Sequence, residues 1–165
     1  MKKSLIVLAF VAGCGASSQQ GGNASGAAPA GMADAESTGA VSDDLTGLYQ
    51  TGAGTRPDQM CVLQKGGTAQ FGLTIWGANL RACSGAGTVT RSGDRLTLKM
   101  GGDSPCTLEA TLKGGKLAFS SDVPASCAYY CGAGASFAGA TLTRIGRTRA
   151  DALKARDIAG ESLCG

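Results

Sequence analysis

Histidine is absent from this chain of 165 residues, and aromatic residues are scarce, with one Trp, three Tyr and four Phe. Without His, the commonest general base, the Ser-His-Asp triad and the usual catalytic zinc sites are excluded. Charged residues make up 16%, below the roughly 25% of an ordinary soluble domain. Only four Pro and irregularly spaced Gly exclude a collagen. The length predicts one domain.

Other catalytic motifs are also missing. The segment Gly134-Ala135-Ser136-Phe137-Ala138 lacks the second Gly of a nucleophile elbow. The paired acids Asp43-Asp44 lie in a polar segment, where nothing would raise a carboxyl pKa for acid–base catalysis. We therefore expect no enzymatic activity and no cofactor.

The chain begins with an export signal. Met1-Lys2-Lys3 is basic, and residues 4–12 form a nearly continuous apolar run, far shorter than the ~20 residues of a membrane-spanning helix. A charged start, a short apolar run and small residues at its end are typical of a signal peptide. The run ends in Val11-Ala12-Gly13-Cys14, which resembles the lipobox of bacterial lipoproteins.

This resemblance implies that residues 1–13 are removed and that Cys14 becomes the acylated N-terminus. Several acyl chains give a durable membrane anchor where one chain does not. The alternative is an ordinary signal peptide with a Cys at its cleavage site. Residue 15 is Gly rather than Asp, the residue of the inner-membrane retention signal, so the resemblance places the protein at the outer membrane, facing the periplasm.

A change of composition divides the mature chain. Residues 14–44 are rich in Gly, Ala and Ser, contain no Lys or Arg, and are predicted to be a flexible linker. Residues 45–165 contain thirteen Lys/Arg and eight Asp/Glu, a net charge of +5 that favours anionic partners such as envelope polymers. The basic residues are scattered in the sequence, which indicates an ordinary solvated surface. Nucleic-acid binding is not expected, because the sequence contains no stripe of basic residues interleaved with aromatics.

Apolar residues alternate with polar ones in the domain, as in Leu96, Leu98 and Met100 or Leu108, Ala110 and Leu112. Such alternation is typical of half-buried antiparallel strands. Gly-rich turns recur between the strands, so neighbours in sequence are predicted to be neighbours in the sheet. We expect an all-β, mainly antiparallel up-and-down meander that closes into a small barrel, with a sandwich as the alternative.

Two terminal motifs refine this prediction. Gly47-Leu48-Tyr49 and the late Arg144 resemble the Gly-x-Trp and Arg of calycin barrels, with Tyr in place of Trp, and the resemblance implies that the Arg packs over the aromatic ring at one barrel end. A capping box at Thr148–Asp151 predicts a short helix over residues 149–159, with Ala150, Leu153 and Ile158 on its apolar face.

The cysteines predict disulfides. With Cys14 acylated, an even number remain, and an even number in an exported domain indicates three disulfides, whose pairing the sequence leaves open. They are Cys61, Cys83, Cys106, Cys127, Cys131 and Cys164. The spacing Cys127-x₃-Cys131 is compatible with a metal site, but no second close pair and no His accompany it, so we expect no metal.

Aromatic side chains near the turns are the candidate binding residues. By alternation, Trp76 lies on the face of Gln70 and Thr74, which we predict to face solvent. Tyr129 and Tyr130 lie between two cysteines in a loop that disulfides would hold rigid. Exposed aromatics near Asn79 and Arg81 are typical of recognition surfaces. The alternative is that Trp76 folds over the end of the barrel and that one of the two tyrosines belongs to the core.

The sequence therefore predicts a monomeric, non-enzymatic envelope lipoprotein that acts as a binding module for an envelope or secreted protein. It resembles small uncharacterised cysteine-rich envelope lipoproteins of alphaproteobacteria, which implies no function. The sharpest hypothesis is an inhibitor of a hydrolase such as lysozyme, on a likeness of architecture alone. The alternatives are a structural or assembly accessory that contacts an anionic envelope polymer, and a carrier of a small apolar ligand.

Overall fold

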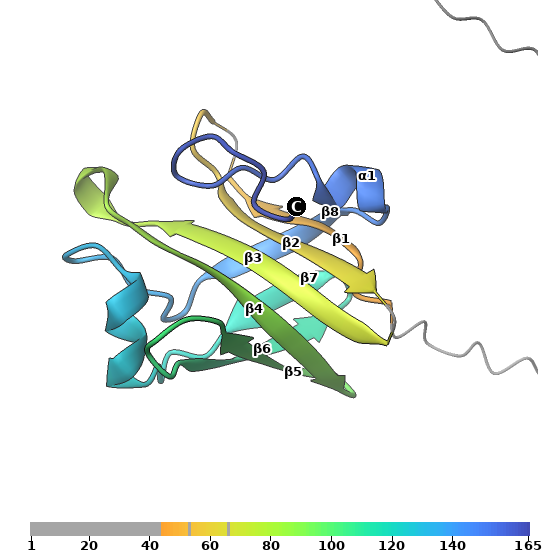
Figure 1. The fold of residues 1–165 in the computed structure, drawn as a ribbon, viewed down its shortest axis with the longest axis horizontal. Coiled ribbons are helices and arrows are strands. Elements are labelled where there is room, and N and C mark those ends of the chain that lie inside the picture. Colours follow the sequence, from red (N-terminus) through yellow and green to blue (C-terminus); the bar gives the residue numbers. More distant parts are fainter. Residues whose placement is uncertain (1–43, 53, 66) are drawn as a thin grey trace, which may run out of the picture. The chain divides into compact units, whose positions relative to one another are not determined.

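The computed structural model describes residues 44–52, 54–65 and 67–165. The predicted signal peptide, Cys14 and all but the last residue of the predicted linker lie outside these residues. Eight antiparallel strands form a closed barrel in which each strand pairs with the next and β8 pairs with β1 (Figure 1). The strands are β1 Gly47–Thr51, β2 Asp58–Lys65, β3 Thr68–Trp76, β4 Ala82–Ser92, β5 Arg95–Met100, β6 Thr107–Lys113, β7 Lys116–Phe119 and β8 Thr141–Gly146.

The alternation in the sequence gives the barrel its filled interior. In β5, Leu96 and Leu98 are fully buried, and their neighbours Arg95 and Lys99 are exposed. In β6, every second residue is buried in the same way. Side chains from all strands meet in one interior cluster, in which Tyr49 is among the largest fully buried residues. The predicted all-β meander is confirmed, and it is a barrel rather than a sandwich.

The up-and-down order gives the barrel two different ends. Three tight turns, β2–β3, β4–β5 and β6–β7, lie at one end together with the start of β1, and we name this the short-turn end. The connections of residues 54–57, 77–81, 101–106 and 120–140 lie at the opposite, long-loop end. The long-loop end also holds two short 3₁₀ helices, η1 Ala78–Leu80 and η2 Ala125–Tyr130.

The chain after β8 packs on the outside of the barrel. The short helix α1, Arg149–Ala152, and the segment that follows it cover outward-facing residues of β1 and β2. Ala152 and Ala155 are fully buried there against Leu48, Cys61 and Leu63 in a second apolar cluster. Strand β2 is consequently buried on both faces, which alternation alone does not predict.

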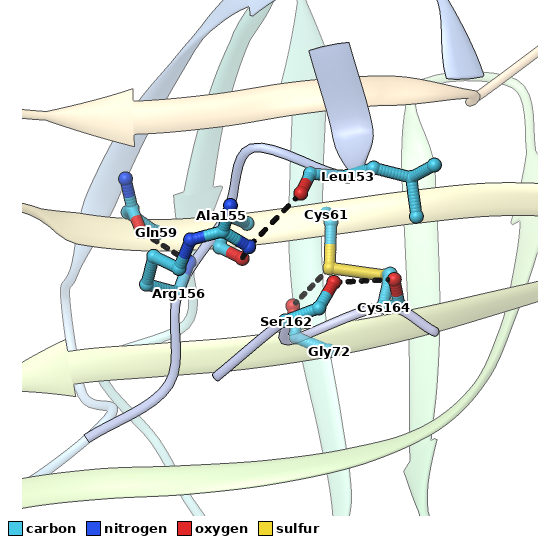
Figure 2. Close-up of a disulfide and its surroundings, with 8 residues drawn as sticks. All are labelled: Gln59, Cys61, Gly72, Leu153, Ala155, Arg156, Ser162 and Cys164. Atoms are coloured by element: carbon cyan, nitrogen blue, oxygen red, sulfur yellow. Dashed lines mark hydrogen bonds between the residues drawn. A yellow bond between two sulfur atoms is a disulfide. The ribbon is translucent and has the colours of Figure 1, made fainter. Parts of the chain in front are cut away.

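The predicted C-terminal helix exists, but it is shorter than expected. Its capping box is present, with Thr148 accepting a hydrogen bond from the Asp151 backbone N–H, yet the helix ends at Ala152 rather than near residue 159. After it, the Arg156 backbone N–H donates to Gln59 Oε1 on β2 at 2.8 Å (Figure 2). The predicted apolar face is also wrong, because Ile158 is 60% exposed and the buried residues are the small Ala152 and Ala155.

Three disulfides are present, as the sequence predicts. They join Cys61 to Cys164, Cys83 to Cys131 and Cys106 to Cys127, and they close loops of 103, 48 and 21 residues in sequence separation. The first fastens the C-terminal segment to β2 (Figure 2). That segment approaches the barrel closely, because a Cβ on Gly72 of β3 would collide with the Leu163 carbonyl oxygen. The other two hold η2 to the barrel.

Candidate binding groove at the long-loop end

The β3–β4 connection is a tight loop at the long-loop end. The Gly77 N–H donates to the Arg81 carbonyl at 2.7 Å, and the Arg81 N–H donates to the Ala78 carbonyl at 3.2 Å. Between them, Asn79 and Leu80 have left-handed backbone conformations, with φ of 56° and 60°. Asn tolerates this conformation well, whereas Leu does so rarely. As a result, the Leu80 side chain is held 67% exposed.

Helix η2 lies at the same end of the barrel (Figure 1). The Cys83–Cys131 disulfide joins the residue after this helix to β4, and the Gly132 N–H donates to the Ala82 carbonyl at 2.8 Å. A Cβ on Gly132 would lie 3.4 Å from carbons of the Arg81 side chain, so Arg81 packs against this backbone. The segment that carries the two tyrosines is therefore attached to β4 by a disulfide and by a backbone hydrogen bond.

The two tyrosines have different roles. The Tyr130 hydroxyl lies 2.7 Å from the Ser104 carbonyl oxygen and 3.1 Å from that of Gly101, so it fastens η2 to the β5–β6 connection. Tyr129 is 66% exposed and contacts the Tyr130 ring edge-on, with 5.2 Å between the centroids. Tyr130 is thus a structural residue with one accessible face, whereas Tyr129 is presented to solvent.

Trp76 ends β3 beside this loop and is partly buried. Its backbone N–H donates to Asp58 Oδ1 at 2.7 Å, and the Arg56 guanidinium lies 5.7 Å from the ring centroid. The prediction that its strand face is solvent-exposed is wrong at Thr74, which is 1% exposed. The C-terminal segment explains this burial. Leu163 contacts the outer face of β3 at Gly72, and Ile158 lies near Trp76, so the segment covers the outer face of β3 between Gly72 and Trp76.

These elements enclose an open groove of about 850 Å³. Four of the five predicted binding residues line it, and Asn79 lies in the adjoining loop instead. The lining comprises Trp76, Leu80, Arg81, Ala82, Ser84, Tyr129, Tyr130, Cys131, Gly132 and Ile158. Leu80 and Ile158 were not predicted from the sequence, since neither lies in a pattern that marks an exposed apolar residue. The small residues Ala82 and Ser84 of β4 also belong to the lining.

A second hollow, of about 560 Å³, shares Trp76 and Ile158 with the groove. Its other lining includes Arg56, Arg156 and Asp157, whereas Arg81 is the one charged residue that lines the groove. Arg156 is held in place by hydrogen bonds from its guanidinium to the carbonyl oxygens of Leu153 and Ala155 (Figure 2). Trp76 and Ile158 therefore lie where the groove meets the more highly charged hollow.

The described part of the chain contains no group of three or more His, Cys, Asp or Glu side chains placed to hold a metal ion. In the same residues, no helix has the length and apolar character needed to cross a membrane.

The lining of the groove includes no carboxylate. Its one hydroxyl-bearing residue of β4, Ser84, has its hydroxyl 3.0 Å from that of Thr74. The arrangement suits contact with an apolar or aromatic partner surface.

Comparison of the chain with protein-family models, with curated proteins and with solved structures gives no match.

Proposed function

We propose that this chain is a lipid-anchored protein of the bacterial cell envelope that binds a partner protein through the groove lined by Trp76 and Tyr129, without catalysing a reaction. The anchor is the acylated Cys14 that the lipobox resemblance implies. The partner is an envelope or secreted protein, and an inhibitory complex with a hydrolase such as lysozyme is the most specific form of the proposal.

One observation carries this proposal. In the described residues, four large apolar side chains are exposed, namely Leu80, Tyr129, Ile145 and Ile158. Three of the four line the same groove, together with the only Trp of the chain. Contiguous exposed apolar surface is typical of interaction sites, and Trp, Tyr and Arg are the residues most enriched at their energetic centres.

The attachment of the groove residues supports binding as well. Tyr129 and Tyr130 follow Cys127 and precede Cys131, and each of these cysteines is joined by a disulfide to the barrel. A surface that is already rigid loses little conformational entropy when it binds, so more of the contact energy contributes to affinity. We therefore attribute these two disulfides to the binding function of the groove, and not only to stabilisation of a small hydrophobic core.

The interior of the barrel supports a surface site over a ligand chamber. Tyr49, Phe71 and Phe137 are among the largest fully buried side chains, and all belong to the interior cluster. A carrier of a small apolar ligand needs a hollow interior. The absence of a carboxylate from the groove lining favours binding over acid–base catalysis.

The test is capture by the immobilised, oxidised mature chain, residues 14–165 with Cys14→Ser, from envelope extract and from a panel of purified lysozymes. Ile158→Ala and Tyr129→Ala remove groove side chains. Ile145→Ala is the matched control, because Ile145 is 58% exposed and lies on β8, away from the groove, whereas Ile158 is 60% exposed.

Loss of a central contact residue typically costs about 2 kcal/mol or more of binding free energy. We therefore expect Ile158→Ala and Tyr129→Ala each to lower the affinity for a captured partner by about 30-fold. Ile145→Ala is expected to leave the affinity, measured by titration calorimetry, unchanged. A partner that binds all three variants equally, or no capture at all from any source, would refute the groove as the binding site.

A further inference from the structure

The short-turn end of the barrel gathers cations that are far apart in the sequence. In an up-and-down barrel, the β4–β5 and β6–β7 turns and the end of β8 lie at the same end. Each of them carries basic residues, which are Arg91 and Arg95, Lys113 and Lys116, and Arg144 and Arg147. Of the acids, Asp44 and Asp94 lie at this end, and Asp151 of α1 lies beside Gly146 at the end of β8. Residues that are scattered along the chain thus form one basic surface, which we name the basic end.

The cations of the basic end lie close together. Lys113 and Lys116 are direct partners across the β6–β7 hairpin, and both are exposed. Burial raises the pKa of the Tyr49 phenol in the barrel interior, while the charges of Arg144, Arg91 and Arg147 all act in the opposite direction. Arg144 lies over this ring, and Arg91 and Arg147, which come from two other places in the sequence, are near enough to act on it by charge.

This concentration of positive charge is a cost to the fold that its own acids do not offset. Like charges directly opposite one another on a hairpin destabilise it. Among the described residues, the one ion pair joins Lys154 to Asp151 of α1, so it pairs none of the cations of the basic end. Arg144 is engaged by the Tyr49 ring and the Thr46 carbonyl. The exposed Lys113, Lys116 and Arg147 form no ion pair among the described residues and are available to an anionic surface.

The long-loop end has no such excess. It carries Arg56, Arg81, Lys99 and Arg156, and these are balanced by Asp58, Asp103, Asp122 and Asp157. The net charge of +5 calculated for residues 45–165 is consequently concentrated at one end of the barrel. The candidate binding groove lies at the opposite, balanced end.

The position of the chain start identifies what the basic end faces. The described chain enters the barrel at this same end, where the Leu45 carbonyl accepts a hydrogen bond from the Tyr49 hydroxyl at 3.0 Å. If Cys14 carries the lipid, the anchor and the basic end are joined by the thirty residues from Gly15 to Asp44. Thirty residues reach at most about 100 Å even when fully extended, so an anchor at Cys14 keeps the domain close to the membrane that holds it.

We propose that the basic end docks on the anionic headgroups of the membrane that holds the lipid anchor, and that it thereby turns the aromatic groove away from the bilayer. This inference uses the proposed anchor to bring the domain to the membrane, while the docking surface consists of described residues alone. Each basic residue near an anionic bilayer contributes up to about 1 kcal/mol, so several together give a measurable attraction.

The test is sedimentation of the oxidised, unlipidated Cys14→Ser mature chain with vesicles. One set contains phosphatidylcholine only, and the other contains phosphatidylcholine with phosphatidylglycerol. We expect binding to the anionic vesicles only, with loss of binding between about 50 mM and about 500 mM salt, because screening shortens the range of the attraction.

Matched charge reversals locate the surface. Lys113→Glu/Lys116→Glu is expected to weaken vesicle binding by about 30-fold or more. Arg56→Glu/Lys99→Glu makes the same change of net charge at exposed positions of the long-loop end, and it is expected to weaken binding by less than about threefold. Equal effects of the two variants would show that net charge acts without a docking surface, and would overturn the proposal.

Hydrogen exchange on the vesicles tests the orientation separately. Protection is expected at the turns of residues 92–95 and 113–116 and not at the loops of residues 77–81 and 101–106. Protection at the long-loop end, or binding to purified peptidoglycan in place of the vesicles, would overturn the proposal. The assay contains no protein partner, and the protein carries no acyl chain, so failure of docking is distinguishable from failure of the proposed anchor or of the groove.

Discussion

Arg144 of β8 lies over the ring of Tyr49 of β1, with its guanidinium carbon 5.6 Å from the ring centroid. The two residues are register partners where the barrel closes. Arg144 Nη2 also donates a hydrogen bond to the Thr46 carbonyl. This is the contact that the resemblance to calycin barrels implies, although membership of that family stays a prediction, because no family model matches the chain.

Replacing Arg144 is therefore expected to destabilise the barrel. Arg144→Ala loses a partly buried cation–π contact and a hydrogen bond from a charged donor, which together predict a decrease of about 2–3 kcal/mol in the free energy of unfolding. Arg95→Ala removes a cation from an exposed position at the same end of the barrel. It is expected to change the free energy of unfolding by less than about 0.5 kcal/mol. Urea unfolding with the disulfides intact measures both, and equal values would contradict the role given to Arg144.

The two adjacent tyrosines give a second prediction. Tyr130→Phe removes the hydroxyl that bonds to the Ser104 carbonyl, and is expected to lower the free energy of unfolding by about 1 kcal/mol. Tyr129→Phe removes an exposed hydroxyl and is expected to leave stability unchanged. The same urea titrations compare the two variants. If Tyr129→Phe lost as much stability as Tyr130→Phe, the conclusion that the Tyr130 hydroxyl fastens η2 to the barrel would be wrong.

The disulfides are expected to differ in their contribution to stability. The Cys61–Cys164 bond closes a sequence separation of 103, against 21 for Cys106–Cys127. Loop entropy in the unfolded chain then predicts losses of about 4.7 and about 3.3 kcal/mol for the respective double Cys→Ala variants. Urea unfolding of the two variants gives the comparison. The opposite order would show that native contacts, and not chain entropy, decide the contribution.

Loss of the Cys61–Cys164 bond is also expected to have a local effect. In hydrogen exchange, the backbone N–H of Leu163, which donates to the Ala155 carbonyl at 3.1 Å, should lose protection before the barrel unfolds. The Cys106→Ala/Cys127→Ala variant is the control, because that bond lies at the other side of the fold and should leave Leu163 protected.

The strands were predictable because alternation is a local signal. Leu96 and Leu98 face the interior because a strand turns successive side chains to opposite sides, and this needs no knowledge of the rest of the chain. The burial of Thr74 was not predictable in the same way. It depends on a segment almost ninety residues later in the sequence that returns to cover β3, and Ala152 and Ala155, which hold that segment down, carry little apolar signal.

The candidate site was predicted in part for the same reason. Trp76, Tyr129 and Tyr130 stand out in a sequence with few aromatics, so their residue types alone marked them. That they share one groove depends on the Cys83–Cys131 pairing, which was one of many possible pairings. The basic end was missed because its cations come from separate turns, and only the topology of the barrel places those turns side by side.

The capping box of α1 gives a pH-dependent prediction. Hydrogen bonds from Lys154 and Thr148 lower the pKa of the Asp151 carboxyl to about 2 from its usual 3.8. The unfolded chain therefore binds this proton more tightly than the folded chain does. The carboxylate consequently stabilises the fold above about pH 4, and this contribution is lost as the pH falls through the folded pKa.

An NMR titration of the Asp151 carboxyl is the direct measurement. The pKa of Asp151 is expected to be near 2 in the native chain. It is expected to rise towards 3.8 in Lys154→Ala, because the hydrogen bond from Lys154 contributes most to lowering it. Lys99→Ala removes a cation from β5 instead, and is expected to leave the Asp151 pKa where it was. If Lys154→Ala does not raise the Asp151 pKa, the 2.7 Å ion pair contributes nothing in solution, and the capping box depends on Thr148 alone.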